Sequence, residues 1–163
     1  MSMPQHFYVV VIASDGEIAS VVTAILGGPG YIRGISPHVI AATTSPNCVN
    51  REILLSMGRS YGLKIPKESV CYTKISPSYK DLWLALDKSA LAVVHEYIRK
   101  NGPPRKSFYR AIWPDAVAYA DVNIPPKPTE DDNEAAWHHW FARLAEEFKI
   151  WEQKLWDAFY DTS

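Results

Sequence analysis

Two short polar segments, each directly after a predicted strand, carry the side chains best placed to bind a ligand. Ser14-Asp15-Gly16 follows Phe7–Ala13, a run of β-branched and aromatic residues, and the loop Thr43–Asn47 follows a second such run, His38–Thr43. Where a strand leads into a helix, hydroxyls and backbone N–H groups can hold a phosphate or a carboxylate. We therefore expect a small-molecule ligand to contact Ser14, Asp15, Gly16, Thr43, Thr44, Ser45 and Asn47.

The alternative for both segments is a capped turn that binds nothing. Ser14 or Asp15 can cap the following helix through a side-chain oxygen, and Asp15 would repel an anion. No G-x-G-x-x-G or Walker A pattern follows. The glycine-rich stretch 27–34 comes after a helix rather than a strand, so we interpret it as a helix terminator and turn.

Asp121 and Asn123 are the candidate catalytic residues, because they end a later predicted strand, Ala116–Ile124, and could face the same crevice. Cys48 lies near a predicted helix start, which could activate its thiol, but an unreactive buried thiol is the simpler interpretation. The histidines lack metal-ligand spacing, so no metal site is predicted. The sequence identifies no cofactor.

The elements that must position these residues follow from apolar spacing. Helices are predicted over Glu17–Leu26 and from a cap at Asn47 or Asn50 to Tyr61, and a third strand over Ser69–Ile75. Another helix is predicted from Ser76-Pro77 to Ile98, with Ala90–Val94 as a short strand in the alternative. The result is an α/β domain over residues 5–124: a Rossmann-like, open, mainly parallel sheet of about four strands with helices on both faces.

The C-terminal part is predicted to be a Pro-rich connector, 125–130, and an amphipathic helix, 131–160, within a single domain overall. Four of the six tryptophans lie in this helix, too much apolar area to leave in water. The helix either packs on its own domain or forms a homo-oligomer through residues 137–159. No membrane partner is expected, because the polar face of the helix is acidic.

Composition places the chain among ordinary globular proteins: 163 residues, 47% hydrophobic, net charge −1. Residues 61–128 are basic and residues 129–163 acidic, so the two parts could dock on each other. The basic loop 99–110 carries aromatics, but with a pI near 6.5 we do not expect nucleic acid as a partner. The two cysteines are too few for a disulfide framework, which indicates a reduced, cytoplasmic setting.

The segment Val39–Pro46 and the turn Tyr61–Pro66 resemble the N-terminal half of folate-dependent formyltransferases, over about residues 7–75. That family carries an Asn-x-His-Pro segment and a later Asp. Here the nearest match is Asn123-Ile124-Pro125-Pro126, which keeps the asparagine and lacks the histidine. The resemblance implies the Rossmann-like fold and a transferase-like activity without its acid–base group.

Two functions follow. The first is binding of a nucleotide-like or carboxylated small molecule, as in a small transferase resembling formyltransferases. The alternative is a non-catalytic interaction or oligomerisation protein that works through its Trp-rich C-terminal helix or the loop 99–110.

Overall fold

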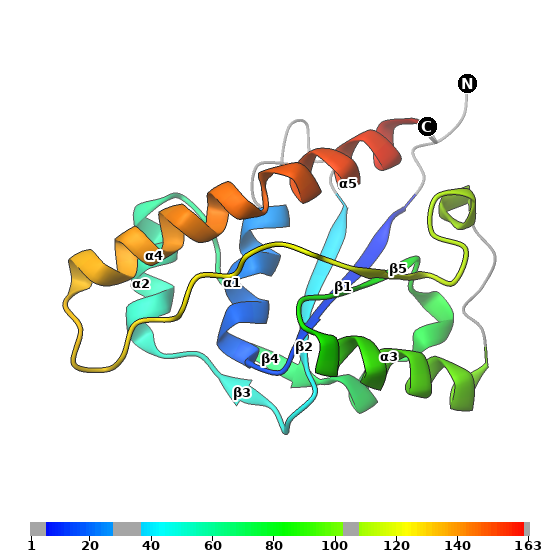
Figure 1. Cartoon of the computed structure of the whole chain (residues 1–163), viewed down its shortest axis with the longest axis horizontal. Coiled ribbons are helices and arrows are strands. Elements are labelled where there is room, and N and C mark those ends of the chain that lie inside the picture. The colour runs from blue at the N-terminus through cyan, green and yellow to red at the C-terminus, as the bar shows by residue number, and fades with distance from the viewer. Residues whose placement is uncertain (1–5, 28–36, 103–107, 162–163) are drawn as a thin grey trace.

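The computed structural model of the chain describes residues 6–27, 37–102 and 108–161, and its centre is a six-stranded sheet (Figure 1). In spatial order the strands are β3 (Cys48–Val49), β4 (Glu68–Cys71), β2 (His38–Thr43), β1 (Tyr8–Ala13), β5 (Leu82–Ala85) and β6 (Val117–Tyr119). Only β3 is antiparallel to its neighbour among these strands. The predicted mainly parallel, Rossmann-like α/β fold is confirmed, with six strands rather than four.

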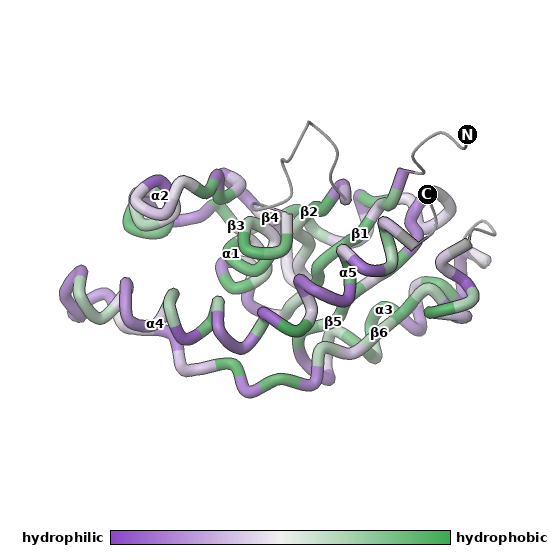
Figure 2. The backbone as a smooth tube through the Cα atoms, turned by 90° about the horizontal axis from the view of Figure 1, so that it is seen from above, coloured by the Kyte–Doolittle hydropathy of each residue, from purple (hydrophilic) through white to green (hydrophobic). Residues whose placement is uncertain are grey.

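Helices cover both faces of the sheet. They are α1 (Gly16–Gly27), α2 (Glu52–Ser60), α3 (Lys88–Asn101), α4 (Glu134–Glu147) and α5 (Lys149–Asp161), with 3-10 turns at Tyr72–Lys74, Pro77–Tyr79 and Phe108–Ala111. Helix α1 packs on β1 and β2 and is itself contacted by α2, α4 and α5, whereas α3 packs on β5 and β6 from the other side. Figure 2 shows the hydrophobic residues gathered along β1, β5 and α1, between these layers.

Strand β1 is buried on both faces because it lies in the middle of the sheet. Val9 and Val11 belong to the core on the α1 side, and Val10 and Ile12 to the core on the α3 side. All four side chains are fully buried. Each such burial stabilises the fold by about 1.5–3 kcal/mol, so every position of the strand has to be apolar.

The helix predicted from Ser76-Pro77 to Ile98 is wrong over its first half. Residues 82–85 form β5, which pairs with β1 and β6, and α3 begins only at Lys88 with Asp87 as its N-cap. A central strand is apolar at every position, so it loses the alternation that marks a strand and continues the stripe of the helix behind it. The alternative strand at Ala90–Val94 is also wrong, since these residues lie within α3.

The other elements differ from prediction mainly at their ends. Arg51, rather than Asn47 or Asn50, precedes α2. Strand β4 stops at Cys71, where a 3-10 turn begins, and β6 ends at Tyr119. Gly62 follows α2 with φ of 70°, a left-handed conformation that glycine adopts without strain.

The aromatic C-terminal segment packs on its own domain, as two helices that meet at Phe148. Its apolar face is buried in the core on the α1 side, including Trp137, Trp140, Phe141, Leu144, Phe148, Trp151, Leu155 and Phe159. The Trp140 indole donates a hydrogen bond to Pro125 O of the connector, at 3.0 Å. Because this face is already covered, the structure gives no support for an oligomer through residues 137–159. No helix among the described residues is long and apolar enough to cross a membrane.

The basic loop is only partly described. Arg99 and Lys100 both pair with Glu96 on the surface of α3, at 2.6 and 3.7 Å. Arg105 and Lys106 lie outside the described residues, as do positions 28–34 of the glycine-rich stretch, while Gly27 ends α1.

Candidate functional site

The loop between β1 and α1 is short, and its polar groups are bonded within the protein. Asp15 Oδ1 accepts hydrogen bonds from the backbone N–H groups of Glu17 and Ile18, at 2.9 and 3.4 Å. A carboxylate of the chain therefore takes the position at the helix start that a bound anion would need. Gly16 is closely surrounded, since a Cβ there would overlap the side chains of Ser69 and Cys48.

Ser14 is held by Asp87, a residue that sequence reasoning missed. Both the backbone N–H and the hydroxyl of Ser14 donate to the Asp87 carboxylate, at 2.8 and 2.9 Å. The same carboxylate accepts from Ala90 N and so caps α3. One aspartate thus joins the carboxyl end of β1 to the start of α3. Nothing in the local sequence pairs positions 14 and 87, because the contact depends on β5 lying beside β1.

Four charged residues are paired behind this loop around the buried Glu17, and we refer to Asp15, Glu17, Arg51 and Lys127 as the α1 ion cluster. Glu17 accepts two hydrogen bonds from the Arg51 guanidinium, Nε to Oε2 at 2.9 Å and Nη2 to Oε1 at 2.8 Å. Lys127 Nζ lies 2.8 Å from Glu17 Oε1 and 2.6 Å from Asp15 Oδ2. The cluster joins the connector to α1, and its two carboxylates and two cations are paired with each other rather than available to a ligand.

The ion cluster changes how its groups titrate. Burial opposes ionisation of Glu17, but the hydrogen bonds from Arg51 and Lys127 outweigh burial and lower the pKa of Glu17 to about 2. The pKa of Lys127 is raised, since Asp15 and Glu17 outweigh the burial that would lower it. Both groups stay charged at neutral pH. The start of α1 therefore holds a buried, ionised carboxylate that is already paired with two cations.

The loop after β2 lies beside the loop after β1, as predicted. The Thr43 hydroxyl donates to Ser14 O at 3.4 Å and accepts from Ser45 N at 3.2 Å, and Thr44 N donates to Ala13 O. Thr43 is fully buried and serves the loop itself. Thr44, Ser45 and Asn47 instead line an open pocket of about 650 Å³ together with Cys71, Thr73 and Lys74. We call this space the Cys71 pocket.

The two cysteines lie at this edge of the sheet and have opposite properties. Hydrogen bonds to the sulfur from the Thr73 hydroxyl, at 3.2 Å, and from the Thr73 backbone lower the pKa of Cys71, and Lys74 adds to that effect. Burial, together with the charges of Glu17 and Asp15, raises the pKa of Cys48. Of the two thiols, Cys71 is the one whose thiolate is favoured.

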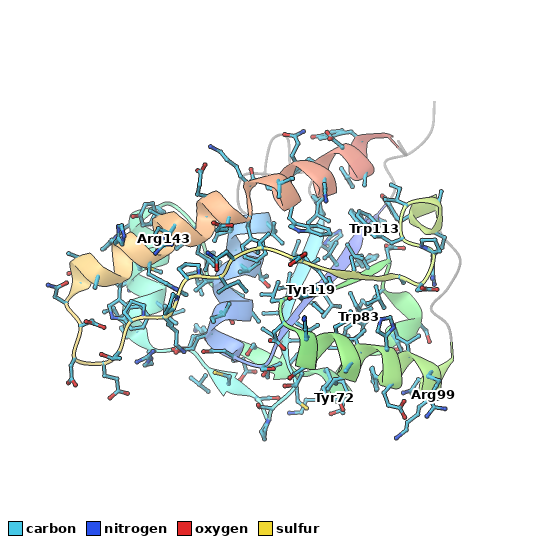
Figure 3. All side chains as sticks on the ribbon, in the orientation of Figure 1. Tyr72, Trp83, Arg99, Trp113, Tyr119 and Arg143 are labelled. Atoms are coloured by element: carbon cyan, nitrogen blue, oxygen red, sulfur yellow. The ribbon has the colours of Figure 1, made fainter. Side chains whose placement is uncertain are left out.

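The Cys71 pocket is built by backbone geometry as well as by side chains. Asn47 Oδ1 accepts a hydrogen bond from Cys71 N at 2.9 Å, which joins the loop after β2 to the end of β4. Tyr72, on the side toward α3 (Figure 3), stands edge-on to Tyr97 with ring centroids 5.0 Å apart. Of the described residues that line the pocket, Lys74 alone is charged.

Asp121 and Asn123, the predicted catalytic residues, lie in the segment that follows β6. Both are exposed, and the residues between and after them, Val122 and Ile124, line the pocket of about 300 Å³ at the ends of β1, β5 and β6. The backbone turns tightly here, with Asp121 N bonded to Tyr119 O and Val122 N bonded to Ala120 O. Within the described part of the chain, no three His, Cys, Asp or Glu side chains are grouped closely enough to hold a metal ion.

Comparison with known proteins finds likeness in structure only. No family model and no curated protein matches the chain. Among solved structures, YwlE arginine phosphatase from Geobacillus stearothermophilus matches with a TM-score of 0.67 at 11% identity, over 96% of this chain and 97% of that one. A low molecular weight protein tyrosine phosphatase from T. tengcongensis matches with a TM-score of 0.63 at 11% identity, over 91% and 99%.

These matches overturn the predicted resemblance to folate-dependent formyltransferases. The shared fold is that of low molecular weight phosphatases, so the predicted family was wrong. The transferase-like, small-molecule-binding function and its non-catalytic alternative are withdrawn with it. The segments 39–46 and 61–66 misled because a strand, a small-polar loop and a helix recur in many parallel sheets.

A third match is a mutant enzyme with a modified active-site residue. It is a cysteine-to-serine mutant of YwlE arginine phosphatase with a phosphorylated active-site serine, at 11% identity, TM-score 0.67, over 91% of this chain and 95% of that one. The mutated residue lies near the start of that chain. In the present chain, the loop after the first strand is Ser14-Asp15, and both cysteines come later, at 48 and 71.

Proposed function

We propose that this protein is a thiol-dependent phosphatase that hydrolyses phosphate monoesters, with Cys71 as its nucleophile. The observation that carries the proposal is the Cys71 thiol itself. The pKa of Cys71 is lowered, and the thiol lines an open pocket. Among the described residues that line this pocket, the one charged side chain is the cation Lys74. The likeness in fold to phosphatases supports phosphoryl chemistry. The loop after β1 contains no cysteine that could serve as the nucleophile.

Charge favours the Cys71 pocket over the loop after β1. A phosphate monoester carries about two negative charges at neutral pH. The loop after β1 would meet it with Asp87, which bonds Ser14, and with Asp15 and Glu17, whose neighbouring cation Lys127 is already paired. The Cys71 pocket offers the ammonium of Lys74 and the hydroxyls of Thr44, Ser45 and Thr73 as donors to phosphate oxygens.

The reaction follows from these groups in two steps. The Cys71 thiolate attacks phosphorus, the bond from phosphorus to the ester oxygen breaks, and the alcohol oxygen leaves with the bonding electrons. Water then attacks the phosphocysteine, the sulfur–phosphorus bond breaks, and inorganic phosphate and the thiolate are released. No carboxylic acid lines the pocket among the described residues, so aryl phosphates, whose phenolates leave without protonation, are the favoured substrates.

The predicted cytoplasmic setting belongs to this proposal. A thiolate nucleophile works only when it is reduced, and reducing compartments keep exposed cysteines in that form. Both Cys48 and Cys71 are free thiols. The substrate is then a phosphorylated protein or a small aryl phosphate of that compartment.

The test is hydrolysis of two aryl phosphate monoesters, p-nitrophenyl phosphate and a peptide carrying phosphotyrosine. We expect activity in the wild-type protein and a loss of about 10³-fold or more in Cys71→Ser. Cys48→Ser is the matched control, since it removes the other thiol at the same edge, and its activity should not change. Absence of hydrolysis in the wild-type protein, or full activity in Cys71→Ser, would refute the proposal.

A second measurement follows the thiols directly. The rate at which iodoacetamide alkylates each cysteine, read by mass spectrometry across a pH series, should rise at lower pH for Cys71 than for Cys48. Equal profiles for the two residues would remove the physical basis for choosing Cys71.

A further inference from the structure

Strand β2 is paired along the whole of one edge and along only part of the other. On one side all six residues, His38–Thr43, pair with β1. On the other side β4 pairs with Ala42 and Thr43 alone, and no described strand lies beside residues 38–41. An unpaired edge of this kind is a template for an added strand.

The ladder with β1 determines which backbone groups face that open edge. His38 N donates to Phe7 O and Thr44 N donates to Ala13 O, so the even-numbered residues of β2 turn their N–H and C=O groups toward β1. In a parallel ladder the intervening residues turn theirs the other way. Val39 N–H, Val39 C=O and Ala41 N–H therefore face away from β1 at the part of the edge that β4 does not reach.

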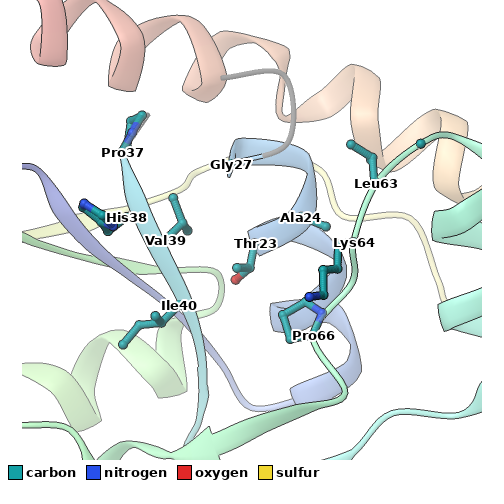
Figure 4. A pocket seen from close by; sticks show the side chains of 11 residues that line it. Thr23, Ala24, Gly27, Pro37, His38, Val39, Ile40, Leu63, Lys64 and Pro66 are labelled. Carbon is teal, nitrogen blue, oxygen red and sulfur yellow. The ribbon is translucent and has the colours of Figure 1, made fainter. Parts of the chain in front are cut away.

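A groove of about 400 Å³ lies along this edge (Figure 4). Its walls are β2 at His38–Ile40 and the segment 62–66 that leads toward β4, and its floor is α1 at Thr23, Ala24 and Gly27. Figure 4 shows β2 and the segment 63–66 diverging on either side of Thr23. The groove lies beside the amino-terminal half of β2, whereas the Cys71 pocket lies beyond the carboxyl end of the same strand.

Two polar side chains in the groove point to the chemistry of its occupant. Thr23 is 4% exposed, and its hydroxyl has no hydrogen-bond partner among the described residues, although a buried hydroxyl normally has one. Lys64 is exposed at the rim and makes no ion pair within the described part of the chain. No carboxylate lines the groove among the described residues, so its charge is complementary to an acid.

We propose that this groove binds an extended, acidic segment of a partner protein as an additional strand on the edge of β2. The alternating N–H and C=O groups of Val39 and Ala41 match a peptide backbone. The apolar walls, with Ile40, Leu63 and Pro66, take its alternate side chains, and Lys64 pairs with a glutamate or aspartate. The inference is independent of Cys71, since neither the residues nor the end of the strand are shared.

The probe is the peptide acetyl-Thr-Val-Glu-Val-Glu-Val-Thr-amide, titrated into the isotope-labelled full chain and followed by NMR. We expect saturable shifts at the amides of Val39, Ala41 and Leu63. The same peptide with lysine in place of glutamate should bind more weakly. A version N-methylated at alternate residues, which cannot form the ladder, should not bind at all.

Variants of the protein give a second readout. Lys64→Glu should weaken binding of the glutamate peptide about two- to fivefold and strengthen binding of the lysine peptide. Lys67→Glu, one residue beyond this segment and outside the groove, is the control and should change neither affinity. Thr23→Val keeps the shape of the side chain and should weaken binding about two- to tenfold if the hydroxyl contacts the peptide.

Four outcomes would overturn the proposal. They are the absence of shifts at millimolar peptide, equal binding of the N-methylated peptide, and wild-type affinity in both Lys64→Glu and Thr23→Val. The fourth is protection of the Val39 and Ala41 amides from hydrogen exchange without peptide, whether or not it depends on protein concentration. That result would mean that another part of the chain, or a second copy, already occupies the edge.

Discussion

Glu17→Gln removes the charge of Glu17 with little change in shape. The substitution therefore tests how much the α1 ion cluster stabilises the fold. The Glu17 side chain is 8% exposed and its pKa is lowered from 4.5 to about 2. This difference between the unfolded and folded pKa of Glu17 corresponds to about 3 kcal/mol of stabilisation at neutral pH, because one pKa unit corresponds to about 1.4 kcal/mol. We therefore expect Glu17→Gln to lower the free energy of unfolding by about 3 kcal/mol at pH 7.

The pH dependence of this loss has a definite sign. The folded-state pKa of Glu17 lies below its unfolded value, so the stabilisation is complete above pH 4.5 and is lost as the pH falls toward 2. Urea unfolding of both proteins between pH 7 and pH 2 should show the difference shrinking over that window. At the acid end the two proteins should approach equal stability.

Glu52→Gln is the matched control for this experiment. Glu52 pairs with Arg59 at 2.6 Å, but its side chain is 75% exposed, so its removal should change stability by about 0.5 kcal/mol or less. If Glu17→Gln were no more destabilising than Glu52→Gln, or if its effect stayed constant from pH 7 to pH 2, the account of the cluster would be wrong.

Two further predictions concern the loop after β1. Gly16→Ala should destabilise the fold by about 1–3 kcal/mol in urea unfolding, because the new methyl group overlaps Ser69 Oγ and Cys48 Cβ; a neutral result would mean that these side chains move aside freely. Asp87→Ala should cost about 1–2 kcal/mol, since it removes the N-cap of α3 and both hydrogen bonds to Ser14. Ser14→Ala, which loses only the hydroxyl bond, should cost less, and the opposite order would show that the cap matters little.

The charges at the loop after β1 explain why polar strand ends are an incomplete guide to a ligand site. Ser14, Asp15 and Thr43 do lie together, as their positions after parallel strands predict. Their bonds are nevertheless made within the chain, to Asp87, to the first turn of α1 and to the backbone of the neighbouring loop. The open, donor-lined space is one strand further along, beside Thr44, Ser45 and Cys71.

The predicted alternative of a capped turn describes Asp15 well. Its carboxylate bonds the free N–H groups of the α1 start, which the residue type alone allows. The residue type alone does not indicate that Lys127, 112 positions away, pairs with the same carboxylate. A cap and a charge cluster therefore share one side chain.

Local pattern alone predicted β1 and β2, as short apolar runs that end in polar loops, and it predicted α1 and the apolar face of the C-terminal helices from their helical spacing. The tertiary structure decided which segments meet. It made β5 a strand, through its neighbours β1 and β6, and it brought Glu17 to Arg51 and Lys127, 34 and 110 positions away. It also gave Cys48 and Cys71 opposite pKa shifts, because each shift depends on charges and hydrogen bonds around the folded thiol and not on the sequence beside it.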